Sequence, residues 1–191
     1  MQEGIRCIIG LGNPGDKYLN TRHNAGFWLI DALVNRHGLQ LRSDNKFFGQ
    51  VGKLSSPAGN LWLLKPMTFM NRSGQAASAL ARFYRLSPGQ ILVVHDELDL
   101  PAGSVRLKKG GGHGGHNGLR DIISALGSKD FYRLRLGIDH PGHRDQVTDY
   151  VLSRPSKDDQ QQIEQAIDSS IDHLNELLQG DFQRFMNEVH R

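Results

Sequence analysis

Short apolar runs alternate with stripes of apolar positions at helical spacing along the first part of the chain. The β-branched run from Arg6 to Gly10 predicts a strand. Apolar residues recur every three to four positions between His23 and His37, which predicts a helix with Gly38 just past its end. Two further strands are expected over Phe47 to Leu54 and Leu61 to Leu64, because the Ser, Pro, Gly and Asn residues between them favour a turn.

The remaining elements continue this alternation. A second helix is expected to begin at Asn71 to Ser73, and the apolar run Ile91 to Val94 is typical of a strand covered on both faces. After it we expect a strand at 105–107, a glycine loop at 110–118, a helix at 119–126, a strand at 132–137, a long helix with an apolar stripe over 163–178, and a short final helix through 189. This order predicts an α/β fold of three layers (α/β/α), with helices on both faces of a mixed, mostly parallel central sheet. In such sheets, ligands bind beyond the carboxyl ends of the strands.

Composition limits the class of protein. The chain has 191 residues, of which 38% are hydrophobic and 23% charged, as is typical of one compact soluble domain. We therefore expect residues 1–191 to form a single domain. No apolar run approaches the roughly 18 residues that span a bilayer, and Ile5 to Leu11 is too short for a signal core, so we expect a cytoplasmic protein with no membrane partner. The only cysteine, Cys7, is expected to fill the core.

Charge is distributed unevenly along the chain. From Ser156 onward, three basic residues stand against eight acidic ones, while the preceding part carries 20 basic and 12 acidic residues. A body with this excess of positive charge attracts phosphates, although solvated Lys and Arg side chains explain the same count.

The segment Gly10 to Gly15 matches the pattern G-x-G-x-x-G after a predicted strand. A dinucleotide site would also need an acid at the end of the next strand, and the only acid near that distance, Asp31, lies within a predicted helix. The alternative is a tight turn eased by glycines. That alternative places Asn13 as a polar side chain at the end of the first strand.

A candidate for general acid–base chemistry follows in the segment Tyr18 to Gly26. His23 lies near the start of a predicted helix, and an imidazole held by a carboxylate is an effective general base at neutral pH. Asp96, directly after the buried strand, is positioned to supply that carboxylate. Water would then be the nucleophile, because the chain contains no G-x-S-x-G serine motif.

Two further motifs carry polar groups. In Lys65 to Asn71, the amide of Asn71 either caps the following helix or turns into the cleft as a donor to a carbonyl or oxyanion. The loop Arg106 to Gly118 joins a strand to a helix through six glycines and no acid, and such backbone favours an anion. His95, His113 and His116 are also considered as zinc ligands with Asp96. They lack the helical presentation and the cysteines of common sites, so we expect no metal.

Five blocks together resemble the successive signatures of the bacterial peptidyl-tRNA hydrolase family. In chain order they are 10–15, 18–26, 65–71, 95–103 and 110–118. The resemblance covers the chain from its first strand to about Gly142, and the length also matches. Residues 156–191 match only in their helical, acidic character, which suits a variable lid of C-terminal helices.

The resemblance implies an esterase that cleaves the bond between a peptide and the 3′-terminal ribose of tRNA and releases both for reuse. It implies no metal or cofactor, and a monomer. His23 would activate water with the help of Asp96, and Asn13 would distinguish N-blocked substrates from free aminoacyl-tRNA. The expected substrate-binding residues are Tyr18, Phe69, Asn71, His116 and Asn117. The expected tRNA phosphate contacts are Lys108, Arg135 and Arg144.

Two other classes of function remain open at this point. A non-catalytic RNA-binding module would explain the basic charge but would give the pairing of His23 with Asp96 no role. A nucleotide-dependent oxidoreductase would explain only Gly10 to Gly15.

Overall fold

A single seven-stranded sheet organises the chain. The computed structural model describes residues 2–190. Its strands are β1 (Cys7–Gly10), β2 (Arg42–Asp44), β3 (Gly49–Ser56), β4 (Gly59–Pro66), β5 (Ile91–Glu97), β6 (Val105–Lys109) and β7 (Tyr132–Gly137). They lie in the order β2-β3-β4-β1-β5-β7-β6. The four central strands β4, β1, β5 and β7 run parallel, whereas β2, β3 and β6 join through antiparallel pairs. The sheet is therefore mixed, with its parallel part at the centre.

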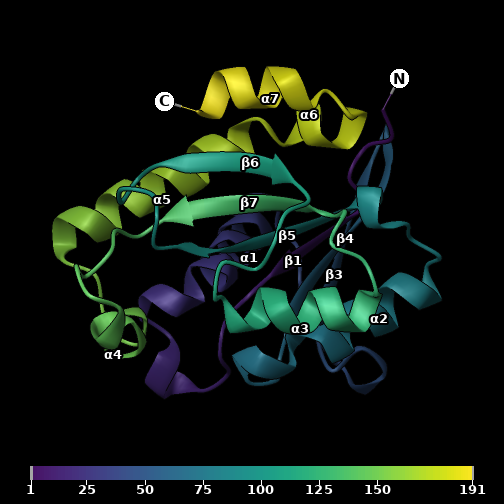
Figure 1. The fold of residues 1–191 in the computed structure, drawn as a ribbon. Helices are drawn as coiled ribbons and strands as arrows, with labels where there is room; N and C mark the ends of the chain where they lie inside the picture. The colour runs from purple at the N-terminus through teal and green to yellow at the C-terminus, as the bar shows by residue number, and fades with distance from the viewer. Residues whose placement is uncertain (1, 191) are drawn as a thin grey trace.

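Helices cover both faces of this sheet (Figure 1). The α-helices are α1 (Ala25–Arg36), α2 (Ser73–Phe83), α3 (Asn117–Leu126), α4 (Val147–Val151), α5 (Lys157–Asp172), α6 (Leu174–Gln179) and α7 (Phe182–Val189). Buried residues of α1, α5, α6 and α7 share one apolar cluster with the sheet, and those of α2 and α3 share another. Three layers result, as the sequence predicts, and no helix within residues 2–190 is long and apolar enough to cross a membrane.

The C-terminal helices belong to the packed core. Ile163, Ile167, Leu177 and Phe185 are all at most 2% exposed and lie in the same cluster as the sheet residues. In addition, His190 accepts a hydrogen bond from the backbone N–H of Leu107, at 2.8 Å, on the edge strand β6. The segment that the family resemblance describes as a lid therefore packs as a layer over one face of the sheet.

Several boundaries differ from the sequence-based expectations. Strand β5 continues through Glu97, so the candidate residues at its end are part of the sheet. The long C-terminal helix is interrupted at His173, where α5 ends and α6 begins. The sequence pattern does not predict the short elements β2 and α4, because three to five residues carry too little periodicity.

Candidate active site

The site is centred on a buried carboxylate at the carboxyl end of β5. Strands β1 and β5 pair in parallel, with Gly10 opposite Val94, so both chains leave the sheet at the same edge. Every residue of β5 up to Asp96 is buried, and Asp96 itself is only 4% exposed. A charge at this depth needs partners, and two imidazoles supply them.

His23 is the first partner of this carboxylate. It lies in a short 3-10 turn, Arg22–Asn24, directly before α1. Its Nδ1 atom lies 2.9 Å from Oδ2 and 3.0 Å from Oδ1 of Asp96. Since an ionised carboxylate only accepts hydrogen bonds, Nδ1 carries the hydrogen and Nε2 keeps its lone pair. The ring is thus held in the form that can accept a proton at Nε2.

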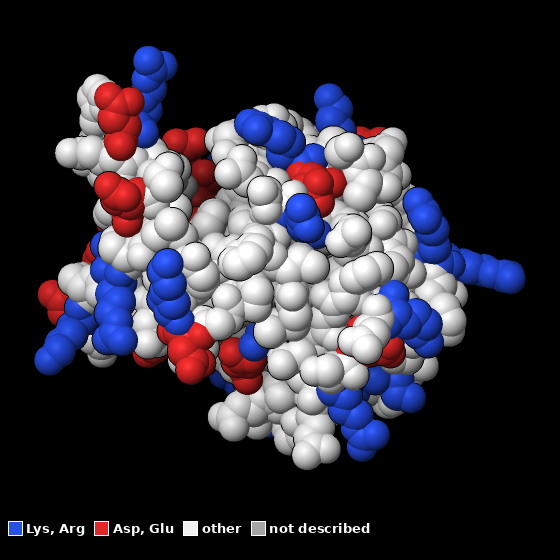
Figure 2. All heavy atoms as spheres, turned by 90° about the horizontal axis from the view of Figure 1, so that it is seen from below, with Lys and Arg blue, Asp and Glu red and all other residues white. Residues whose placement is uncertain are grey.

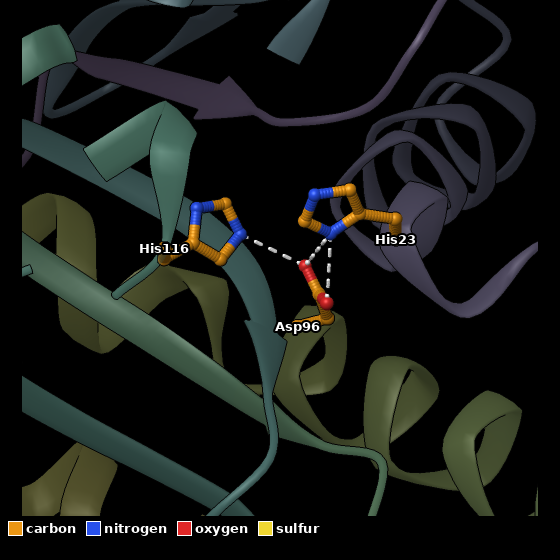
Figure 3. Close-up of side chains that lie close together, drawn as sticks. All are labelled: His23, Asp96 and His116. Atoms are coloured by element: carbon orange, nitrogen blue, oxygen red, sulfur yellow. Dashed lines mark hydrogen bonds and ion pairs between the residues drawn. The ribbon is translucent and has the colours of Figure 1, made fainter. Parts of the chain in front are cut away.

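His116 is the second partner, and its ring lies beside that of His23, with centroids 5.0 Å apart, so that both imidazoles reach Asp96 (Figure 3). It is the N-cap of α3, where its Nδ1 accepts the backbone N–H groups of Gly118 and Leu119 at 3.2 and 3.3 Å. Its Nε2 therefore carries the hydrogen and donates it to Asp96 Oδ1 at 2.9 Å. Helix capping thus fixes the tautomer of this histidine.

These contacts lower the pKa of Asp96 and raise the pKa of His23. Burial by itself would raise the pKa of Asp96, but the charges and hydrogen bonds of His23 and His116 outweigh burial and hold it well below its usual range. Burial by itself would lower the pKa of His23, but the charge and hydrogen bond of Asp96 reverse that effect and raise it above 6.5. The carboxylate of Asp96 is therefore ionised in the folded protein at neutral pH.

His95 contributes a third imidazole close to this centre, without touching the carboxylate. Its ring lies 5.0 Å from that of His116, and its Nδ1 donates to the backbone oxygen of Asp96 at 2.7 Å. Burial, together with the nearby His116, lowers its pKa to about 4. His95 is thus neutral at physiological pH and holds the backbone at the end of β5. The sequence suggested it only as a zinc ligand.

The donor atoms of His23, Asp96 and His116 lie within 4.8 Å of one another, close enough to suggest a metal site. The tautomers argue against it. Binding through Nε2 of His116 would move its hydrogen to Nδ1, which already faces two backbone N–H groups. The cluster is therefore better suited to hydrogen bonding than to metal coordination. The expectation of a metal-free site stays a prediction.

A reciprocal pair of asparagines supports the mouth of the site. The side chain of Asn24 accepts the backbone N–H of Asn13 at 2.8 Å and donates to its backbone oxygen at 3.0 Å. Asn13 Oδ1 in turn accepts the backbone N–H of Met70 at 2.7 Å. One side of the Asn13 amide is therefore used to hold the segment that carries Phe69 and Asn71. Asn24 directly follows His23 in the same motif, but the motif by itself does not predict this supporting role.

The other expected substrate contacts lie at the surface. Phe69 is 58% exposed and meets the ring of Tyr18 edge-on, with centroids 6.5 Å apart. Asn71 is also exposed, and α2 begins without a side-chain cap, so the alternative of a capping Asn71 is wrong. Asn117 is the exposed first residue of α3, next to His116. Both amides are accessible to a ligand.

The structure places two of the three expected phosphate contacts at one cavity. Lys108 and Arg135, from β6 and β7, line a cavity of about 320 Å³ together with Glu97, whose Oε1 accepts from Arg135 Nε at 2.9 Å. Buried Arg133 donates to the backbone oxygens of Gly110, Gly112 and Lys129 and so secures the glycine loop beside this cavity. Arg144 instead lines a neighbouring cavity with Asp96 and His116. Figure 2 shows Lys and Arg side chains around the rim of one face, with a largely uncharged centre.

The fold and the site together define the class of this protein. It is an α/β enzyme with an imidazole–carboxylate pair, His23 and Asp96, at the edge of the sheet where the parallel strands end. Comparisons with known proteins identify the family. The family model described as peptidyl-tRNA hydrolase matches residues 7–191. A peptidyl-tRNA hydrolase of Coxiella burnetii is 57% identical over 190 residues and all of both chains. One from Halorhodospira halophila is 58% identical over 97% of this chain and 96% of the relative.

A solved structure agrees with these sequence relatives. Peptidyl-tRNA hydrolase from Acinetobacter baumannii superposes with a TM-score of 0.94 at 44% identity, over all of this chain and 96% of that chain. The chain belongs to the peptidyl-tRNA hydrolase family.

Proposed function

We propose that this chain hydrolyses the ester bond between peptide and tRNA with a water molecule that His23 activates. Membership of the peptidyl-tRNA hydrolase family supports the reaction. The observation that supports the role of His23 is its tautomer. Its Nδ1–H donates to Asp96, which leaves the lone pair of Nε2 to accept a proton from water.

The proposed reaction has two steps. Water transfers a proton to His23 Nε2 while its oxygen attacks the ester carbonyl carbon, and Asp96 stabilises the imidazolium that forms. The tetrahedral intermediate collapses, the bond to the ribose oxygen breaks, and His23 returns its proton to that oxygen. The exposed amides of Asn71 and Asn117 are suitable donors to the oxyanion.

Substrate recognition divides between the two sides of the site. We assign the peptide and the 3′ end of tRNA to Asn13, Tyr18, Phe69, Asn71, His116 and Asn117. Lys108 and Arg135 would hold a tRNA phosphate in their shared cavity, with Arg144 as a further basic contact. The proposal includes a single-domain, monomeric, cytoplasmic enzyme without a cofactor.

The direct test is hydrolysis of N-acetylated aminoacyl-tRNA beside the unacetylated form, with and without a chelator. We expect rapid cleavage of the blocked ester, slower cleavage of the free aminoacyl ester, and no effect of the chelator. Binding of tRNA without cleavage would instead support the alternative of a non-catalytic RNA-binding module. Loss of cleavage in the chelator would contradict the metal-free mechanism.

Replacing Lys108 with alanine should weaken tRNA binding by about 3- to 30-fold and leave kcat nearly unchanged. The reason is that a phosphate contact contributes to binding in the ground state and the transition state alike. The slope of log Kd against log salt should become shallower by about 0.7 to 0.9. Fluorescence binding titrations at several salt concentrations measure both effects. Lys53→Ala, an exposed lysine of β3 at the other side of the sheet, is the control, and an unchanged slope for Lys108→Ala would remove this residue from the tRNA site.

A further inference from the structure

The turn that carries His23 is held by its two neighbours in different directions. Asn24 bonds to the backbone of Asn13, on the segment that follows β1. Arg22 reaches the opposite way, to the segment that includes α4, more than 120 residues away in sequence. His23 between them faces Asp96. Three consecutive residues therefore join three separate parts of the chain.

The guanidinium of Arg22 contacts the backbone oxygens of Tyr150 and Ser153 and the ring of Tyr150. Its Nη1 donates to the backbone oxygens of Tyr150 and Ser153 at 3.0 and 3.3 Å, and also to Ser153 Oγ. The guanidinium carbon lies 3.8 Å from the centre of the Tyr150 ring. In the backbone, the Arg22 N–H donates to the oxygen of Ser153 at 3.1 Å. The residue is only 8% exposed, and its Nε is buried with no hydrogen-bond partner within residues 2–190.

This arrangement is costly for a charged group. A buried guanidinium is normally paired with a carboxylate, whereas the partners of Arg22 are two carbonyls, one hydroxyl and an aromatic face. These contacts suit a planar fork that bonds at its edge and stacks on its face, which lysine does not offer. The position therefore depends on arginine geometry as well as on positive charge.

The segment that Arg22 clamps borders the active site. His140, Arg144, Val147 and Val151 line the same cavity of about 320 Å³ as Asp96 and His116. The hydroxyl of Tyr150 donates to the backbone oxygen of Ile138 at 2.6 Å, which ties α4 to the end of β7. Movement of this segment would therefore alter the space beside the carboxylate and, through Arg22, the position of His23.

We propose that Arg22 is a positioning residue, which clamps the turn of His23 onto the segment 138–153 and so holds the imidazole in register with Asp96. The inference rests on the proposed role of His23 as general base, and extends it to a residue that touches neither substrate nor the reacting atoms. The general cost of misplacing a catalytic group by about 1 Å is of the order of 100-fold in rate. The contacts of Arg22 with the 138–153 segment prevent such a displacement of the His23 imidazole.

The pKa of His23 reports this geometry directly. The titratable groups that face the ring are Asp96 from β5 and His116 from α3, with Arg22 on its own turn. Loosening the clamp weakens the contact with Asp96, which is what raises the pKa of His23, so this pKa should fall back toward about 6.5. Nuclear magnetic resonance of ¹⁵N-labelled histidine measures this value without reference to activity.

The experiment compares Arg22→Gln, Arg22→Lys, Ser153→Ala and the double variant Arg22→Gln/Ser153→Ala. We expect the His23 pKa to fall in all four. We also expect kcat to drop by about 10-fold in Arg22→Gln with KM changed less than about threefold. Arg22→Lys keeps the charge and should recover only part of the rate. The double variant should be no slower than Arg22→Gln alone, because both changes break one clamp. Arg36→Gln, which removes an arginine bridge from α1 to α5 away from the site, is the control for general loss of stability.

The outcomes separate this inference from the proposed function. A lowered melting temperature with unchanged His23 pKa and kcat would make Arg22 merely structural. Full recovery in Arg22→Lys would assign the effect to charge and overturn the clamp, as would strict additivity in the double variant. Retained activity in His23→Ala would contradict the proposed function, yet the titration of His23 in the Arg22 variants would still decide whether the clamp exists.

Discussion

Replacing His23 with alanine is expected to lower kcat on N-acetylated aminoacyl-tRNA by about 10²- to 10⁴-fold, the usual contribution of a general base. The Kd for tRNA should change little, because the imidazole accepts its proton only as the transition state forms. Single-turnover kinetics with excess enzyme, together with binding titrations, separate the two quantities. Equal losses of rate and affinity would contradict the role of a base.

The pH dependence of the unmodified enzyme belongs to the same prediction. Because Asp96 raises the pKa of His23, the basic form is lost as pH falls through a value above 6.5, and kcat/KM should decline there. His37→Ala, an exposed histidine at the end of α1, should leave both the rate and this decline unchanged. A decline that persists in the residual activity of His23→Ala would assign the titration to another group.

Asp96→Asn is expected to lower kcat by about 10²- to 10⁴-fold, although the new side chain has the same shape. The reason is that His23 and His116 both donate hydrogen bonds to the carboxylate of Asp96. The tautomer of His116 is fixed by the backbone of α3, so its Nε2–H requires the amide oxygen. The amide NH₂ then faces Nδ1 of His23 and forces the hydrogen of that ring onto Nε2. The lone pair that would accept a proton from water is lost.

The same substitution changes how stability depends on pH. In the folded protein the pKa of Asp96 lies below its unfolded value of about 3.9, so its ionisation stabilises the fold above that pH and this stability is lost as pH falls further. Asp96→Asn should therefore lose less stability than the unmodified protein between neutral and strongly acidic pH. Urea unfolding at several pH values tests this, with Asp158→Asn on the exposed start of α5 as the control. Parallel curves for Asp96→Asn and the unmodified protein would contradict the conclusion that ionised Asp96 stabilises the fold.

Much of the fold could be predicted because the signals are local. Strand β7 occupies the predicted residues 132–137, and the apolar run at 91–94 lies within β5. A buried strand needs apolar residues on both faces, and a helix needs one apolar stripe, so both patterns are visible in a few consecutive residues. The break at His173 and the short helix α4 lack such patterns, and the contacts that define them come from distant parts of the chain.

The candidate site likewise has one part that the sequence predicts and another that only the tertiary structure shows. The sequence by itself determined the α/β class, the pairing of His23 with Asp96 as candidates, and the family resemblance, because each depends on residue types in a fixed order. Only the tertiary structure placed His116 as a second donor to the carboxylate and Arg22 against Tyr150 and Ser153. It also assigned Lys108 and Arg135 to one cavity and Arg144 to another. The physical reason is that hydrogen-bond tautomers, stacking and shared cavities depend on distances of a few ångströms between segments far apart in sequence, and only packing of the whole chain sets those distances.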